Sequence, residues 1–180
     1  MGYDPDIHHR RSIRLKGYDY RQPGMYFVTI CSWERQPLFD LPELRGILLE
    51  TWEDLPSRFS TVAVDTFVVM PDHVHGIFHL KSPIRYMKSP AVDDVMRVYK
   101  SITSVQWIRL NKNRGTRCAG HLWQERFYDH VIRNEKDLQR IREYILNNPL
   151  KSELLQGKDI EDNIWEEIIN CYILRNSGES

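Results

Sequence analysis

The stretch from Met70 to Leu80 (MPDHVHGIFHL) decides the fold of this chain and points to its chemistry. His73 and His75 stand one residue apart at the start of a strand-like run. Side chains alternate between the two faces of a strand, so both imidazoles are expected on the same face, close enough to share one metal ion. The opposite face then receives the positions that suit a core, which are Val74, Gly76, Phe78 and Leu80.

A His-x-His pair alone is a weak metal motif, because a single histidine is most often a surface or hydrogen-bonded residue. His79 shares the face of the pair, but it lies about 13 Å beyond His75 along a strand and is too far away for the same ion. Position 77 is Ile, so the spacing of the histidine-triad nucleotide hydrolases is absent. The pair by itself leaves both a metal site and an ordinary polar surface open.

Composition places the chain among globular proteins. Its 180 residues suit one domain with a real core, and 41% hydrophobic and 28% charged residues are typical of a soluble protein. The three cysteines form no Cys-x-x-Cys pair, which argues against a disulfide framework or a cysteine zinc site and favours a reducing cytoplasm. The polar first 14 residues do not form a signal peptide, and no apolar run reaches membrane-spanning length.

The net charge of zero conceals an uneven distribution. From Val95 to Gln124 there is no acid, while the stretch from Glu153 to Ser180 is acidic. A basic middle indicates a surface for a polyanion, although a plain solvated helix and loop would look the same. The basic residues of the acid-free stretch are Arg97, Lys100, Arg109, Lys112, Arg114 and Arg117.

The pattern of elements predicts an α+β protein. Strands are expected at 25–33, 62–70, 73–80 and 127–133. A first helix is expected from Pro42 to about Asp54, with Asp40 as its N-cap. A second helix is expected from Val92 or Asp93 to about Leu110, and the residues along one of its faces are Val95, Tyr99, Ile102 and Gln106. The order β-α-β-β-α-β is that of a ferredoxin-like antiparallel sheet. The first and third strands are then central, so the histidine pair lies on a central strand, and both helices cover the face opposite the histidines.

Additional C-terminal helices follow the predicted sheet. Asn134 is expected to cap a helix whose apolar positions are Leu138, Ile141 and Ile145, and which stops at 147–149. A further helix is predicted at 160–174. We interpret residues 1–155 as the main domain and 156–180 as an acidic helical extension of it.

Tyr144 and Asn148 are the second half of the candidate site. Residues four apart share one face of a helix, and the open sheet face is the expected place for this helix. Tyrosine is a known covalent nucleophile, and a nearby cation helps it to ionise. The alternative is a packed aromatic followed by a plain helix stop at Pro149, which also disfavours helical geometry at Asn148.

With these residues assembled, the chain resembles the REP-associated tyrosine transposases, which are single-tyrosine HUH (His-hydrophobic-His) transposases of the insertion-sequence type. Five segments match in the family's order and together cover roughly residues 10 to 155. The family usually has Asn at the position of Asp72, a turn position that tolerates either residue. The matching segments are RRSIRLKGYDY (10–20), YFVTIC (26–31), VVMPDHVHGI (68–77), LWQERFYDHVIRN (122–134) and REYILNNPLK (142–151).

The resemblance implies a role for each candidate residue. His73 and His75 match the metal-binding pair, Asn148 matches a third ligand, and the family's divalent ion is Mg²⁺ or Mn²⁺. Tyr144 matches the nucleophile, which forms a 5′-phosphotyrosine and frees a 3′-OH. The implied partner is single-stranded DNA, often a hairpin with a short recognised sequence beside it, bound by a monomer or homodimer near the nucleoid.

DNA contacts and the role of His130 remain more open. The basic N-terminal residues and the acid-free stretch are expected to contact phosphates. His130 shares a strand face with Tyr128 and Ile132, where it either reaches a phosphate or a proton near the tyrosine, or packs under the tyrosine's helix. The predicted DNA contacts are Arg10, Arg11, Arg14, Lys100, Arg126 and Arg133.

Two other functions compete with transposition. A domesticated relative that processes chromosomal repeats would share all of these residues. A non-enzymatic module that binds nucleic acid is the third possibility, since the sheet face of this fold also stacks RNA bases on aromatic residues. Histidines at the matching face of the third strand count against that module.

Overall fold

The computed structural model describes residues 15, 17–83, 89–115 and 121–154. The chain forms two compact units, residues 1–146 and 147–180, and the division falls within the last described helix. All four strands and both histidines of the predicted pair belong to the first unit. The predicted boundary at residue 155 and the helix predicted at 160–174 lie outside the described residues.

Four antiparallel strands form one sheet, in the order β2-β3-β1-β4. They are β1 (Gly24–Cys31), β2 (Val62–Val69), β3 (His73–Leu80) and β4 (Tyr128–Ile132). The predicted α+β fold with the first and third strands at the centre is therefore confirmed. β3 pairs with β1 along its whole length, from Gly24 opposite Leu80 to Cys31 opposite His73.

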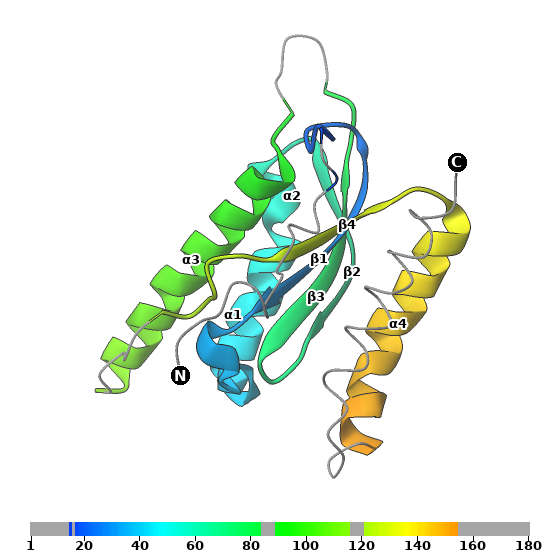
Figure 1. Cartoon of the computed structure of the whole chain (residues 1–180). Helices are drawn as coiled ribbons and strands as arrows, with labels where there is room; N and C mark the ends of the chain where they lie inside the picture. Colours follow the sequence, from blue (N-terminus) through cyan, green and yellow to red (C-terminus); the bar gives the residue numbers. More distant parts are fainter. Residues whose placement is uncertain (1–14, 16, 84–88, 116–120, 155–180) are drawn as a thin grey trace, which may run out of the picture. The chain divides into compact units, whose positions relative to one another are not determined.

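Helices cover both faces of the sheet. The helices α1 (Pro42–Glu53) and α3 (Val92–Asn113) lie on one side of it, and the opening turns of α4 (Glu135–Leu154) lie on the other (Figure 1). The short helix α2 (Leu55–Arg58) follows α1, and two 3-10 turns, η1 (Trp33–Arg35) and η2 (Leu38–Asp40), link β1 to α1.

The alternation read from the sequence of β3 produces two separate cores. Val74, Phe78 and Leu80 pack in the larger core with buried residues of α1 and α3. Gly76 belongs to this face because Trp52 of α1 presses on it: an added Cβ would lie 2.5 Å from two ring carbons of Trp52. Ile77 points the other way and joins the smaller core beneath α4. The sequence prediction that Val74, Gly76, Phe78 and Leu80 share one core-facing side of the strand is confirmed.

Three local expectations are corrected. Asp40 does not cap α1: it closes the turn η2, and Leu41 takes the N-cap position without a side-chain hydrogen bond. The buried stripe of α3 continues from Tyr99 to Thr103, one helical turn on, and not along Ile102 and Gln106, because Thr103 accepts a hydrogen bond from the buried indole of Trp123.

The third correction concerns α4, which does not stop at 147–149 but continues to Leu154. A proline inside a helix removes one backbone hydrogen bond and strains its neighbour, but it does not forbid the helical dihedrals. The predicted cap at Asn134 is confirmed, since its Oδ1 accepts a hydrogen bond from the backbone N–H of Asp137 at 2.8 Å. Among the residues described, no helix has the length and apolar character needed to cross a membrane.

Candidate active site

The two histidines of β3 face each other. Their Nε2 atoms lie 3.0 Å apart, and the ring centroids are 4.5 Å apart. His75 is 1% exposed, whereas the side chain of His73 is 15% exposed. Two facing imine nitrogens repel each other unless a proton or a cation lies between them, so this geometry suits a shared ion. The prediction that both side chains lie on one strand face is confirmed.

Each histidine is held in place through its other ring nitrogen. Nδ1 of His75 hydrogen-bonds to Oγ1 of Thr29 at 2.7 Å, and Thr29 is its direct partner across the β1–β3 ladder. Nδ1 of His73 hydrogen-bonds to Oδ1 of Asp72 at 2.5 Å. Partners of this kind fix the ring orientation of metal-binding histidines and leave Nε2 directed at the ion.

The hydroxyl of Tyr144 meets the histidine pair from α4. Its Oη lies 3.4 Å from Nε2 of His75, and the two ring centroids are 5.3 Å apart. Phe27 of β1 contacts both rings, with centroid distances of 5.5 Å to His75 and 6.3 Å to Tyr144. This aromatic group fixes the phenol beside the imidazole, so the structure brings together the predicted nucleophile and the predicted ligands.

Burial determines the charge of His75. Removal from water lowers its pKa well below the usual value, and electrostatic interactions with His73 and Arg35 lower it further, against a smaller opposing effect of Asp72. His75 is therefore neutral at pH 7 and keeps a lone pair for a cation. Within the described ranges, no third His, Cys, Asp or Glu completes a cluster with this pair.

Asp72 and Arg35 are parts of the site that the sequence reasoning missed. Burial raises the pKa of Asp72, but the hydrogen bonds and electrostatic interactions with His73 and Arg35 outweigh this effect and leave the pKa lowered. Arg35 donates from Nη1 to Oδ2 of Asp72 at 3.2 Å. Adjacency to His73 could have indicated Asp72, which acts as more than a turn residue. Nothing in the sequence indicated Arg35, because it lies 37 positions away.

Asn148 is buried on α4, one helical turn beyond Tyr144. Its amide Nδ2 has no hydrogen-bond partner within the part of the chain that the structure describes. A buried amide of this kind is a candidate for a ligand, because an unsatisfied polar group is costly. Asn148 belongs to the second compact unit, and its role as a third metal ligand stays a prediction.

His130 supports the helix that carries the tyrosine. It lies on β4, and its Nε2 hydrogen-bonds at 2.8 Å to Oδ2 of Asp137, a residue of the first turn of α4. Asp137 is 7% exposed and also accepts a hydrogen bond from Arg140 at 2.9 Å. This contact matches the expected packing of His130 under the tyrosine's helix, and its catalytic role stays a prediction.

The predicted DNA contacts separate into several groups. Arg126 is exposed just before Tyr128, which pairs with Thr29 at the end of the sheet that carries the histidines. Arg133 follows the opposite end of β4. Lys100 donates from Nζ to the backbone carbonyls of Gln124 and Glu125 at 2.6 and 2.9 Å, so it has a structural role as well. Arg10, Arg11 and Arg14 lie outside the described residues.

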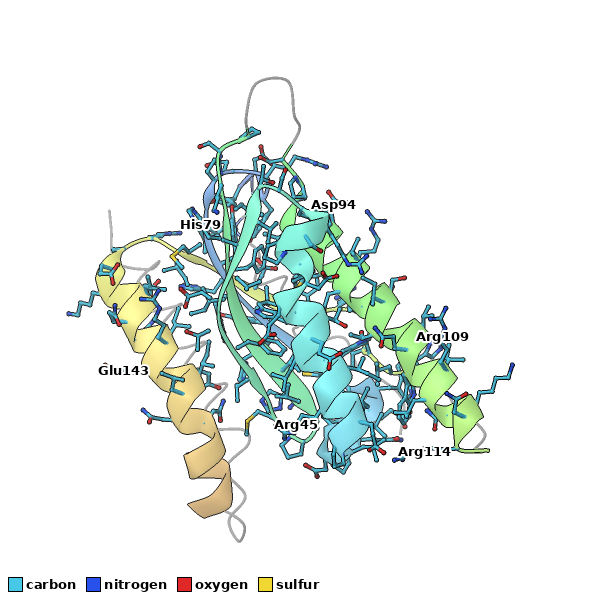
Figure 2. The ribbon with its side chains drawn as sticks, turned by 180° about the vertical axis from the view of Figure 1, so that it is seen from behind. Arg45, His79, Asp94, Arg109, Arg114 and Glu143 are labelled. Atoms are coloured by element: carbon cyan, nitrogen blue, oxygen red, sulfur yellow. The ribbon has the colours of Figure 1, made fainter. Side chains whose placement is uncertain are left out.

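The basic side chains of α3 lie across the sheet from Tyr144. Figure 2 shows Arg109 on α3 and Arg114 directly after its last residue, on the opposite side of the strands from Glu143 of α4. Arg114 also bonds to Glu43 of α1. The acid-free stretch therefore does not line the histidine face over the length of α3.

The comparison with known families agrees with this site. A family model described as "Transposase IS200 like" matches residues 24–148. The chain belongs to this family. The part shared with the IS200-like transposases begins at β1 and ends on α4, so it contains the sheet, both histidines, Tyr144 and Asn148. The resemblance found in the sequence is thereby confirmed, and the chain is a member of an enzyme family.

Individual relatives are consistent with the family. A Haemophilus influenzae protein without an assigned function is 35% identical over 173 residues, which cover 82% of this chain and 92% of the relative. A REP-associated tyrosine transposase of Escherichia coli K12 is 30% identical over 136 residues, which cover 73% of this chain and 70% of the relative. A solved REP-associated tyrosine transposase, bound to a REP hairpin, is 25% identical with a TM-score of 0.50, covering 77% of this chain and 73% of that one.

Proposed function

We propose that this protein cuts and rejoins single-stranded DNA through a covalent bond to Tyr144, as a step of DNA transposition. One observation carries the proposal: the phenol oxygen of Tyr144 lies 3.4 Å from an imidazole nitrogen that itself faces a second imidazole nitrogen at 3.0 Å. A nucleophile and a cation site thus converge on one point, which is where a phosphodiester would have to bind.

The bond changes in this reaction balance without an outside energy source. Oη of Tyr144 attacks phosphorus, the P–O3′ bond breaks, and the products are a 5′-phosphotyrosine and a DNA strand with a 3′-hydroxyl. The phenolic proton leaves to solvent or a base, and the departing 3′-oxygen takes up a proton. Attack by another 3′-hydroxyl reverses the step, releases Tyr144 and joins two strands.

We further propose that His73 and His75 hold a divalent ion, with Asn148 as a third ligand. The fit rests on the facing Nε2 atoms and on the neutral state that burial gives to His75. When bound, Mg²⁺ or Mn²⁺ would act as a Lewis acid toward the phosphate oxygens. Two imidazoles suit Mn²⁺ better than Mg²⁺, which prefers oxygen ligands.

The proposed substrate is a DNA hairpin with a short single-stranded recognition sequence beside it. A solved relative is bound to a REP hairpin, and the match to that relative covers 77% of the present chain. Arg126, exposed at the histidine end of the sheet, is the best-placed described residue for a phosphate contact. Arg10, Arg11 and Arg14 remain proposed contacts as well.

Covalent trapping on single-stranded DNA tests the nucleophile. The wild-type protein, mixed with a labelled hairpin oligonucleotide and Mn²⁺, is expected to form an adduct that survives a denaturing gel. Tyr144→Phe removes one oxygen and is expected to bind the DNA but form no adduct. Tyr128→Phe is the matched control, because Tyr128 also contacts Phe27 (6.0 Å) and should keep the adduct. An adduct mapped to another residue by mass spectrometry would disprove the assignment.

Metal binding is tested apart from catalysis. Mn²⁺ at 100 times its Kd is expected to stabilise the wild-type fold by about 2.7 kcal/mol. His73→Ala should remove this stabilisation, while His79→Ala should not, because His79 lies further along the same face of β3 (Figure 2). Equal stabilisation of both variants by Mn²⁺ would disprove the site.

A further inference from the structure

An exposed tryptophan follows the strand that carries half of the site. Trp33 lies two residues beyond the end of β1, begins the turn η1, and is 37% exposed. Indole is the largest apolar side chain, and solvent exposure of so much of it is unfavourable without a partner. None of the three residues of the turn η1 is buried in the core.

The alternation of β1 places Trp33 on the histidine side of the sheet. Phe27 and Thr29 both contact His75, and Cys31 pairs directly with His73. Ser32 keeps an extended backbone (φ −60°, ψ 159°) and bridges to Trp123, so the alternation continues one step to Trp33. At the rise of an extended strand, Trp33 is about 7 Å beyond Cys31.

Backbone hydrogen bonds hold this turn firmly. The N–H of Trp33 donates to the carbonyl of Leu122 at 2.9 Å, and the N–H of Ser32 donates to the carbonyl of Asp72 at 2.7 Å. The hydroxyl of Ser32 also donates to the carbonyl of Gln36, at 2.7 Å. The indole is therefore attached to a fixed frame that includes the residue before His73.

The turn is strained where it meets the site. Glu34 and Arg35 both have positive φ angles, 53° and 56°, in the left-handed region that non-glycine residues rarely adopt. Each such residue costs on the order of 1 kcal/mol or more, and the surrounding structure must maintain it. These two residues directly follow Trp33, and the guanidinium of Arg35 reaches Asp72. Such strain concentrates at sites of binding or catalysis.

We propose that Trp33, together with His121, is a stacking platform for one unpaired DNA base beside the cleaved phosphodiester. The imidazole of His121 lies 4.9 Å from the indole, centroid to centroid, at an angle of 50°. The two rings are thus tilted against each other, and both residues are exposed. This inference rests on the proposed function, since it assumes that single-stranded DNA reaches the histidine end of the sheet.

The surroundings favour a base over a protein partner. A protein-docking patch needs several contiguous apolar side chains, whereas stacking needs one aromatic face. The other large apolar side chains found exposed lie on α1, α3 and α4, and not on η1: Leu49, Val105, Ile108 and Leu146. The neighbours of the indole are polar, with Glu34 and His121 exposed and Arg35 partly so.

A binding cycle with abasic DNA tests the platform. Cleavage is prevented with Tyr144→Phe in every sample, and affinity is measured for a hairpin oligonucleotide and for versions that lack one base at each single-stranded position. Trp33→Leu is expected to weaken binding roughly 5- to 100-fold, the range for the loss of one stacked base, and Trp33→Phe much less. At one single-stranded position, removal of the base should lower the DNA affinity of the protein that keeps Trp33. The same removal should leave the DNA affinity of the Trp33→Leu variant unchanged.

Controls separate this inference from the proposed function. Ile108→Ala removes an exposed apolar side chain from α3 and should leave affinity unchanged. Unchanged binding by Trp33→Leu, or a loss that is equal at every abasic position, would overturn the platform even if the wild-type protein forms its adduct. Absence of the wild-type adduct would overturn the proposed nicking, while the binding cycle would still decide whether Trp33 stacks on a base.

Discussion

Arg142 of α4 donates two hydrogen bonds to the carboxylate of Asp65 on β2, from Nε at 3.0 Å and from Nη2 at 2.5 Å. Asp65 lies in a β-bulge, where the pairing of β2 with β3 shifts between Val64 and Phe67. Arg142 precedes Tyr144 by two residues. An irregularity in an edge strand thus ties the sheet to the helix that presents the phenol.

This ion pair makes the stability of the fold depend on pH. The hydrogen bond from Arg142 lowers the pKa of Asp65 to about 2, against the opposing effect of burial, with further help from Thr66. Since the folded-state pKa is lower than the unfolded value, the pair stabilises the fold above about pH 4, and this stabilisation disappears as the pH falls through 2. Asp65→Asn is expected to cost roughly 1 kcal/mol at pH 7, reduced from the full linkage value because the pair is partly exposed.

Thermal unfolding measured from pH 7 down to pH 2 checks this prediction. The difference in Tm between the wild-type and Asp65→Asn proteins should narrow as acid protonates Asp65. Glu50→Gln is the control, because Glu50 lies at an exposed position on α1. A difference in Tm that stays constant over this pH range would contradict the role of the ion pair.

Substitution by alanine is expected to have opposite effects on stability at two glycines. Gly76→Ala would place a Cβ 2.5 Å from the indole of Trp52 and should destabilise the fold by about 1–3 kcal/mol, the usual cost of overpacking. Gly46→Ala lies within α1 with open space around it and should stabilise the fold by up to about 1 kcal/mol. Urea unfolding of both variants measures the change in the free energy of unfolding, which should be negative for Gly76→Ala and positive for Gly46→Ala. A Gly76→Ala protein as stable as wild type would show that Trp52 can move.

The fold was largely predictable because period-two patterns determine which face of each strand is buried. The bounds of β3 agree with the prediction at both ends, because the turn at Pro71 and Asp72 marks its start. The strand order followed from the βαββαβ order alone. The end of α4 was not predictable, because a proline shifts the local preference by only a few kcal/mol, which other contacts can exceed.

The candidate ligands and nucleophile were predictable from local patterns, but the partners that orient them were not. His73 and His75 share a strand face, Tyr144 followed from the expected place of its helix on the open sheet face, and the family resemblance implied its role. The partners that orient them come from distant segments: Thr29 is 46 positions from His75, and Arg35 is 37 positions from Asp72. Such pairs form through sheet register and a left-handed turn, neither of which leaves a local pattern in the sequence.

Asp72 should control metal affinity through the orientation of His73. Asp72→Asn keeps a carbonyl oxygen that can accept the hydrogen bond from Nδ1, so its Mn²⁺ affinity should stay within about tenfold of wild type. Asp72→Ala removes the acceptor and should weaken Mn²⁺ binding about 10- to 100-fold, as is usual for a group that orients a ligand. Mn²⁺ titration of the three proteins, with melting curves to exclude unfolding, measures the effect. An equal loss of Mn²⁺ affinity in Asp72→Asn and Asp72→Ala would show that the charge of Asp72 matters more than its orientation of His73.

His130 is expected to act on α4 and not on the proton of Tyr144. Its Nε2 is bonded to the buried carboxylate of Asp137, and Asn134 caps the same turn. His130→Gln should therefore weaken a hydrogen bond to a charged group and lower stability by about 1–2 kcal/mol. The pH profile of adduct formation should keep its shape, because no ionisation in the cleavage step is removed. If the profile instead lost one ionisation at unchanged Tm, His130 would be a proton-transfer group and the packing role would be wrong.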